Sequence, residues 1–301
     1  MSDRRSFLRT SLNGLGVAAL PLLGSIAGCQ QNPARAAGGA PVRAALSIAK
    51  LTNRVSVIRG APGNVVVLSD DNNAVTLVDS GSPTLAASVQ KSLAGARVSK
   101  LFNTHYHADQ TGGNALFAKA GAEIHAHTIT KQWLAADYYV PAVDRWVKAP
   151  PKDAVPTVTF RTHGEIKVGA ETVQFGYLLE AHTRGDAYVY FRDSNVLAVG
   201  DVVSPQRDPS LDWYAGGWLG GRADAMDDLL DLVNDQTIIV PAYGPVMTRA
   251  ELQTERDMMT KLYDLTAEET HKGRSAQDML SDDLMSQVDR KFDDPARFLY
   301  D

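Results

Sequence analysis

Two histidines and an aspartate alternate at the end of one apolar segment of the chain. Residues 101–104 are followed by His105, His107 and Asp109. Because alternate side chains of an extended segment point the same way, these three can converge on one point. Two imidazoles in this spacing suit Zn²⁺, which takes nitrogen ligands in tetrahedral geometry. A His-x-His pair also occurs on ordinary surfaces, so a metal site needs further ligands from elsewhere in the chain.

Four further segments place acidic, histidine or tyrosine side chains beside glycines. They are Val78-Asp79-Ser80-Gly81, Ala181-His182-Thr183-Arg184-Gly185-Asp186, Val199-Gly200-Asp201 and Val240-Pro241-Ala242-Tyr243-Gly244. In order with the first segment, this set resembles the loops of the metallo-β-lactamase-fold hydrolases, whose metal loop is His-x-His-x-Asp-His followed by Gly-Gly-Asn. The resemblance spans roughly residues 50–248. The ordered set is far more specific than any single motif.

The resemblance implies an intact first metal site. His105, His107 and His182 stand where that family has its three histidine ligands. Three neutral imidazoles and one exchangeable water form a known catalytic zinc arrangement. We therefore expect one zinc ion in each chain.

The second metal site of the family is altered in this sequence. Asp109 and Asp201 are kept, but Gln110 and Tyr243 stand where the family has histidines. These two residues offer only oxygen donors, which suit hard cations better than zinc. The resemblance thus implies that a second ion binds weakly. An alternative is that both ligands drifted because function was lost.

The implied reaction is hydrolysis, in which a metal-bound hydroxide attacks an ester, lactone, thioester or amide carbonyl. Asp109 would accept a proton from the water, and Tyr243 would donate a hydrogen bond to the developing oxyanion. Asp201 would hold the hydroxide or the metal. A β-lactamase activity ranks below an esterase or lactonase activity, because lactam cleavage in this family uses the second site.

Two other functions stay open at this point. A chain with no working centre would be a binding protein that keeps the fold and the pocket. Some members of the fold are iron enzymes that oxidise sulfur compounds with two histidines and an aspartate, which here would be His105, His182 and Asp201.

All the tryptophans fall in two segments that the fold would place beside the metal. They are Trp133, Trp146, Trp213 and Trp218. Pockets are commonly lined by aromatic groups with a few polar anchors, so we expect a small apolar or aromatic substrate. Arg184 is a candidate contact for an anionic group of that substrate. Alternatively, the rings only pack long loops onto the core and Arg184 is a surface residue.

The elements around these motifs predict the fold class. β-Branched runs at 55–59, 65–68 and 75–78, separated by turn residues, indicate strands. Segments with apolar spacing of three and four, such as 249–272, indicate helices. With the resemblance, this predicts an α/β protein built as a four-layer αββα sandwich of two mixed sheets with outer helices. We expect this domain over residues 46–248 and a C-terminal helical extension over 249–301.

The N-terminus has the features of an export signal. Arg4-Arg5 before an apolar stretch resembles a twin-arginine signal, and Ile26-Ala27-Gly28-Cys29 resembles a bacterial lipobox. We expect a signal peptide over 1–28, a tether over 29–45 and a periplasmic protein, with a lipid on Cys29 as the only membrane contact. Cleavage after residues 34–36 or an uncleaved anchor are the alternatives.

Composition restricts the partners. Hydrophobic residues are 44% and charged residues 22%, which are ordinary globular values. A formal net charge of -5 gives no basic surface for nucleic acid. Cys29 is the single cysteine, which excludes an intrachain disulfide and a multi-cysteine metal site. A small-molecule substrate is therefore the expected partner, and nothing in the sequence indicates an oligomeric state.

Overall fold

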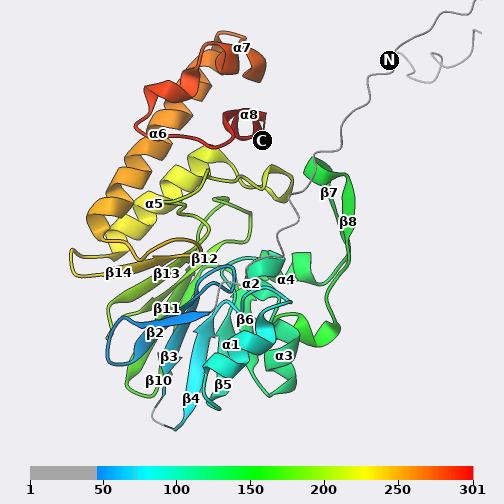
Figure 1. Ribbon diagram of the computed structural model, residues 1–301, viewed down its shortest axis with the longest axis vertical. Coiled ribbons are helices and arrows are strands. Elements are labelled where there is room, and N and C mark those ends of the chain that lie inside the picture. Colours follow the sequence, from blue (N-terminus) through cyan, green and yellow to red (C-terminus); the bar gives the residue numbers. More distant parts are fainter. Residues whose placement is uncertain (1–45, 71, 301) are drawn as a thin grey trace, which may run out of the picture. The chain divides into compact units, whose positions relative to one another are not determined.

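Figure 1 shows the computed structural model, which describes residues 46–70 and 72–300. The signal peptide expected over 1–28 and the tether expected over 29–45 lie outside the described residues. In the part of the chain that the structure describes, no helix combines the length and the apolar character needed to cross a membrane.

The first sheet has seven strands in the order β1-β2-β3-β4-β5-β6-β9. It is mixed, because its pairs are antiparallel from β1 to β4 and parallel from β4 to β9. The parallel strands end at one edge, which is where their following loops meet. The strands are β1 (Ser47–Lys50), β2 (Val55–Arg59), β3 (Val65–Ser69), β4 (Ala74–Val78), β5 (Arg97–Phe102), β6 (Glu123–His127) and β9 (Val158–Phe160).

The second sheet has five strands in sequence order from β10 to β14. It is also mixed: the pairs are antiparallel except for the parallel pair β13-β14. A separate hairpin joins β7 (Tyr138–Val140) to β8 (Arg145–Val147). The five strands are β10 (His163–Val168), β11 (Glu171–Tyr177), β12 (Ala187–Phe191), β13 (Val196–Gly200) and β14 (Ile238–Pro241).

The two sheets pack face to face through one buried apolar cluster. Val57 and Val66 of the first sheet share this cluster with Phe175, Val189 and other residues of the second. Burying apolar area in this way gives about 25 cal/mol per Å² and is the main force that holds the layers together.

Helices cover the outer faces of both sheets (Figure 1). On the first sheet, Val89 of α1 (Ala86–Ser92) and Phe117 of α3 (Asn114–Lys119) pack in one cluster with strand residues. On the second, Met226 of α5 (Leu219–Leu232) and Leu252 of α6 (Arg249–His271) pack against β13 and β14. The layers are therefore helix, sheet, sheet and helix, which confirms the predicted αββα sandwich.

The start of α6 is fixed by a capping box, in which Thr248 and Glu251 exchange hydrogen bonds.

Shorter helices complete the described part of the chain. The remaining helices are α2 (Ala108–Thr111), α4 (Thr128–Leu134), α7 (Ala276–Ser281) and α8 (Pro295–Tyr300), with 3₁₀ turns η1 (Pro141–Val143), η2 (Lys152–Ala154), η3 (Trp213–Ala215) and η4 (Leu284–Gln287).

Candidate metal centre

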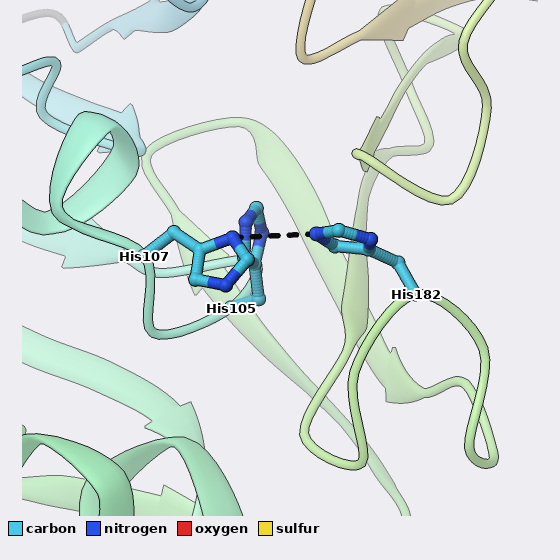
Figure 2. A group of neighbouring side chains, drawn as sticks. All are labelled: His105, His107 and His182. Carbon is cyan, nitrogen blue, oxygen red and sulfur yellow. Dashed lines mark hydrogen bonds between the residues drawn. The ribbon is translucent and has the colours of Figure 1, made fainter. Parts of the chain in front are cut away.

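Three histidines from two separate loops meet at one point of the fold. His105 and His107 follow β5, and His182 lies in the loop between β11 and β12. One ligand nitrogen from each ring lies within 4.8 Å of the others, and Figure 2 shows the three rings turned toward one another. His105 and His182 are buried and His107 is half-buried.

His105 is oriented through the residue before it. Thr104 donates its backbone N–H (2.9 Å) and its hydroxyl (2.8 Å) to the buried carboxylate of Asp79, just after β4. The Thr104 oxygen lies 3.1 Å from Nδ1 of His105, and because its own proton is donated to Asp79, it accepts a hydrogen bond from Nδ1–H. Nε2 of His105 is then an unprotonated acceptor, and it is buried with no hydrogen-bond partner among the described residues. Burial raises the pKa of Asp79 to about 8, against the lowering effect of the two hydrogen bonds from Thr104.

His182 is held by a backbone carbonyl and by a closed turn. Its Nδ1 donates to the carbonyl oxygen of Ser210 at 2.8 Å, which leaves Nε2 facing the other rings. The turn after it is closed by Asp186, whose carboxylate accepts from the backbone N–H (2.6 Å) and the hydroxyl (2.9 Å) of Thr183. Burial raises the pKa of Asp186 to about 7.

His107 is held by Asp212, a carboxylate that the sequence analysis did not single out. Nε2 of His107 lies 2.9 Å from Asp212, which also accepts a hydrogen bond from the Tyr106 hydroxyl. Burial alone would lower the pKa of His107, but the hydrogen bond and the charge of Asp212 outweigh it, and the pKa is raised. Nδ1 of His107 therefore faces the centre of the site.

The inward nitrogens suit a metal ion. Nε2 of His182 and Nδ1 of His107 lie 3.3 Å apart, and a dashed line joins them in Figure 2. Because the outer nitrogen of each ring donates its proton elsewhere, both inward nitrogens carry lone pairs when the rings are neutral. Burial also holds the pKa of His105 and of His182 well below the usual range, which keeps both rings neutral. Converging lone pairs on oriented imidazoles are the donor set that zinc prefers.

The residues at the second metal position do not fit a metal ion as they stand. The guanidinium of Arg207 forms an ion pair with Asp201, and its Cζ lies 3.5 Å from the centre of the Tyr243 ring. The hydroxyl of Tyr243 donates a hydrogen bond to Oδ2 of Asp109. The same oxygen accepts a hydrogen bond from Nε2 of Gln110 at 3.4 Å. The cationic side chain of Arg207 thus already neutralises Asp201, while Asp109 is held by two neutral groups.

A buried arginine fixes the loop that follows β13. Arg222 of α5 is fully buried and donates to the carbonyl oxygens of Asp201 (2.7 Å), Val202 (2.7 Å) and Ser210 (2.6 Å). It also donates to the hydroxyl of Ser204. Burial lowers the pKa of Arg222 to about 10, so the guanidinium stays charged at neutral pH. Because Ser210 in turn binds His182, this arginine ties α5 to the metal centre.

The aromatic residues expected to line the pocket are spread over several environments. Trp133 stacks on Tyr106 with ring centres 4.8 Å apart, and Tyr106 contacts His107. Trp146 is exposed on the β7-β8 hairpin, and Trp213 is exposed in η3.

The other two pocket candidates have partners of their own. Trp218 packs edge-on against Tyr263 of α6, with ring centres 5.7 Å apart. Arg184 is exposed and pairs with Glu180 at 3.1 Å. Among the described residues, Trp133 therefore reaches the histidines through one intervening ring, Tyr106.

Asp212 and Arg207 could not be found from local sequence patterns. Asp212 lies 105 residues after its partner His107, and Arg207 reaches Asp201 from a loop with no motif. The only signal was indirect: both lie between the Asp201 motif and α5, in a segment that holds Trp213 and Trp218.

The family now follows from fold, site and sequence together. The model of the metallo-beta-lactamase superfamily matches residues 58–243, more than half of the chain. The chain therefore belongs to the metallo-beta-lactamase superfamily, with a hydrolase-like fold and a histidine triad that could bind a metal ion. The family predicted from the motifs is confirmed.

Individual relatives are distant. The chain is 24% identical over 203 residues to metallo-beta-lactamase type 2 of Bacillus sp. (strain 170) and 25% identical to that of Bacillus cereus, covering 66% of this chain and 73% of each relative. A metallo-beta-lactamase from Pontibacter korlensis matches with a TM-score of 0.59 and 18% identity, over 71% of this chain and 99% of that one. The inverting sec-alkylsulfatase Pisa1 from Pseudomonas sp. matches with a TM-score of 0.60 and 16% identity, over 85% of this chain and 47% of that one. The structural likenesses show the shared fold.

Proposed function

We propose that this protein is an exported hydrolase that uses one metal ion, zinc, to cleave an ester, lactone, thioester or amide bond of a small apolar or aromatic molecule. One observation carries the proposal. The inward nitrogens of His107 and His182 lie 3.3 Å apart with their outer nitrogens bound to acceptors, and the buried Nε2 of His105 faces the same point. A cation bound between the rings would be coordinated by these lone pairs and would relieve their mutual repulsion.

The residues beside the triad have roles that fit hydrolysis. A bound zinc ion would supply hydroxide near neutral pH and polarise the substrate carbonyl. Both hydrogen bonds to Asp109 reach Oδ2, so we assign Oδ1 of Asp109 as the proton acceptor. Tyr243 donates its hydroxyl hydrogen bond to Asp109, so we assign Tyr243 the role of holding that carboxylate in place. A role for Tyr243 as an oxyanion donor stays a prediction that would require this bond to break.

The iron-oxygenase alternative is less well supported. It needs Asp201 as a ligand beside His105 and His182. Oδ2 of Asp201 lies 3.6 Å from Nε2 of His182, but it is paired with Arg207. The third imidazole, His107, is the group that faces the site instead.

Metal analysis tests the proposal. The purified mature protein should hold about one zinc ion per chain, and His182→Ala should lose it because a ligand is gone. Asp201→Ala should weaken binding less. His163→Ala, which changes an exposed histidine on β10, is the matched control and should keep the ion. A parent protein that binds no zinc after dialysis against zinc would reject the proposal.

A substrate panel tests the reaction. Aryl and alkyl esters, lactones, thioesters and β-lactams should be compared at one zinc loading, and aryl esters are expected to be cleaved fastest. Trp213→Ser, which changes the exposed ring next to Asp212 in the chain, should raise KM for aryl esters about threefold to tenfold, which corresponds to about 1 kcal/mol. Tyr300→Ser, another exposed aromatic change, should leave KM unchanged. Zinc-dependent cleavage of none of these bonds would reject the reaction class.

The proposal includes the location of the protein. The paired arginines Arg4-Arg5 and the sequence ending in Cys29 support export and attachment of a lipid. Expression in a bacterium with fractionation should find the protein in the membrane fraction, and Cys29→Ser should move it to the soluble periplasmic fraction. Protein retained in the cytoplasm would contradict export.

A further inference from the structure

An arginine stands among the residues that hold the second metal in related loops. Arg207 pairs with Oδ2 of Asp201 and lies over the Tyr243 ring, with Cζ 3.5 Å from the ring centre. The hydroxyl of the same Tyr243 ring donates a hydrogen bond to Asp109. One guanidinium therefore connects, directly or through Tyr243, both carboxylates of the altered site.

The C-terminal extension holds Arg207 in place. Arg290 donates to the backbone carbonyl oxygens of Ser204 and Arg207 and pairs with Glu255 of α6 at 2.8 Å. The next residue, Asp208, accepts backbone N–H groups of Asp293 and Asp294 at 3.0 and 2.7 Å. The backbone from which Arg207 projects is thus fixed by residues outside the family match.

A guanidinium is suited to replace a metal charge. Its positive charge persists at every accessible pH, and its flat face packs on aromatic rings while its edge binds carboxylates. A divalent ion placed beside it would meet a like charge and would compete for Asp201. The altered ligands Gln110 and Tyr243 are therefore part of a rearranged site.

We infer that Arg207 is the built-in cation of the second metal position and that it limits the chain to one metal ion. The inference rests on the proposed function, because it assumes that the histidine triad holds the first ion. It deepens that proposal by giving the single-ion state a cause in this chain's own residues.

Removal of Arg207 should open a second ion site. In Arg207→Ala the carboxylate of Asp201 loses its ion-pair partner, and Oε1 of Gln110 is already buried with no hydrogen-bond partner among the described residues. Equilibrium dialysis against zinc or manganese, followed by elemental analysis, should show a second ion at least tenfold tighter than in the parent. Adding Asp201→Ala should abolish it.

Three further variants sharpen the test. Arg192→Ala removes an exposed arginine just after β12 and should have the parent's metal content. Gln110→His with Tyr243→His restores the family's ligands and should still bind one ion, whereas adding Arg207→Ala should give two. If Arg207→Ala does not fold, Arg207→Gln keeps the length without the charge and replaces it.

The outcomes separate this inference from the proposed function. Two ions in the parent, or one ion in the Arg207 variants with the restored ligands, would overturn the role of Arg207. A parent without any ion, together with an Arg207→Ala protein that gains one through Asp201, would support the role of Arg207 and reject the histidine site. The readout is metal content, which a merely structural arginine would leave unchanged.

Discussion

At the scale of residues, each histidine of the site is positioned by a different kind of partner. His107 binds a carboxylate, His182 binds a backbone carbonyl, and His105 binds a threonine hydroxyl. Each partner fixes which nitrogen carries the proton and therefore which nitrogen faces the metal position. Such outer partners commonly change metal affinity by 10- to 100-fold.

Asp212→Asn should weaken zinc binding about tenfold or more, because His107 loses the charge that orients it and increases its basicity. Competition with a chelator of known zinc affinity measures the change. Asp137→Asn, on the exposed hairpin, is the control and should have the parent's affinity. An affinity within twofold of the parent would show that Asp212 plays no part in metal binding.

Asp186 should make the stability of the metal-free protein depend on pH. Burial raises its pKa from 3.8 to about 7, although hydrogen bonds from Thr183 and the charges of Arg222 and His107 oppose the shift. Between these values the folded chain keeps a proton that the unfolded chain releases. The stability that this retained proton gives to the folded chain is complete below pH 4 and is lost as the pH rises through about 7.

Urea unfolding with a chelator present measures this effect. The free energy of unfolding of the parent, minus that of Asp186→Asn, should fall by up to about 4 kcal/mol between pH 4 and pH 8. The variant removes the titrating group, so other ionisations cancel in the difference. Parallel pH profiles for the two proteins would contradict the raised pKa.

At the scale of elements, the loop between β13 and α5 is the part of the scaffold that most directly shapes the site. It carries Arg207, Ser210 and Asp212. Arg222 of α5 and Arg290 of the C-terminal extension hold it by donating hydrogen bonds to its backbone carbonyl oxygens. The chemistry of the site thus depends on elements that contribute no metal ligand.

Arg290→Met should destabilise the fold by about 3 kcal/mol, since it leaves Glu255 buried without its partner. Thermal unfolding should show a lower Tm, and a second change, Glu255→Met, should recover part of the loss. Lys148→Met, which breaks an exposed pair with Asp137, should leave Tm unchanged. Equal Tm values for Arg290→Met and the parent would show that the extension does not support the loop.

The sequence could predict the strands and the outer helices from short patterns, whereas the full triad was implied by the resemblance of several ordered loops to a known family. Alternating β-branched runs mark strands, and His105 and His107 belong to one local motif. The partners of the triad could not be predicted in this way. Asp212 and Arg207 act across folded contacts, and Trp218 packs on Tyr263 of a helix that begins 31 residues later. Such pairs appear only when the loops are placed in space.

At the scale of the whole molecule, a shared scaffold carries a changed centre. Solved structures at 16 to 18% identity share the fold, since the fold depends on apolar patterning that many sequences satisfy. Function depends on the few side chains at the strand ends. In this chain those residues combine a complete histidine triad with an arginine at the neighbouring position.

The most direct test of this account is the crystal structure of the zinc-loaded protein, with anomalous scattering recorded at the zinc edge. We predict a single anomalous peak, from one zinc ion bonded to Nε2 of His105, Nδ1 of His107 and Nε2 of His182. The Arg207 guanidinium should still be paired with Asp201. A peak beside Asp201 in place of that guanidinium, or no peak among the three imidazoles, would contradict the account.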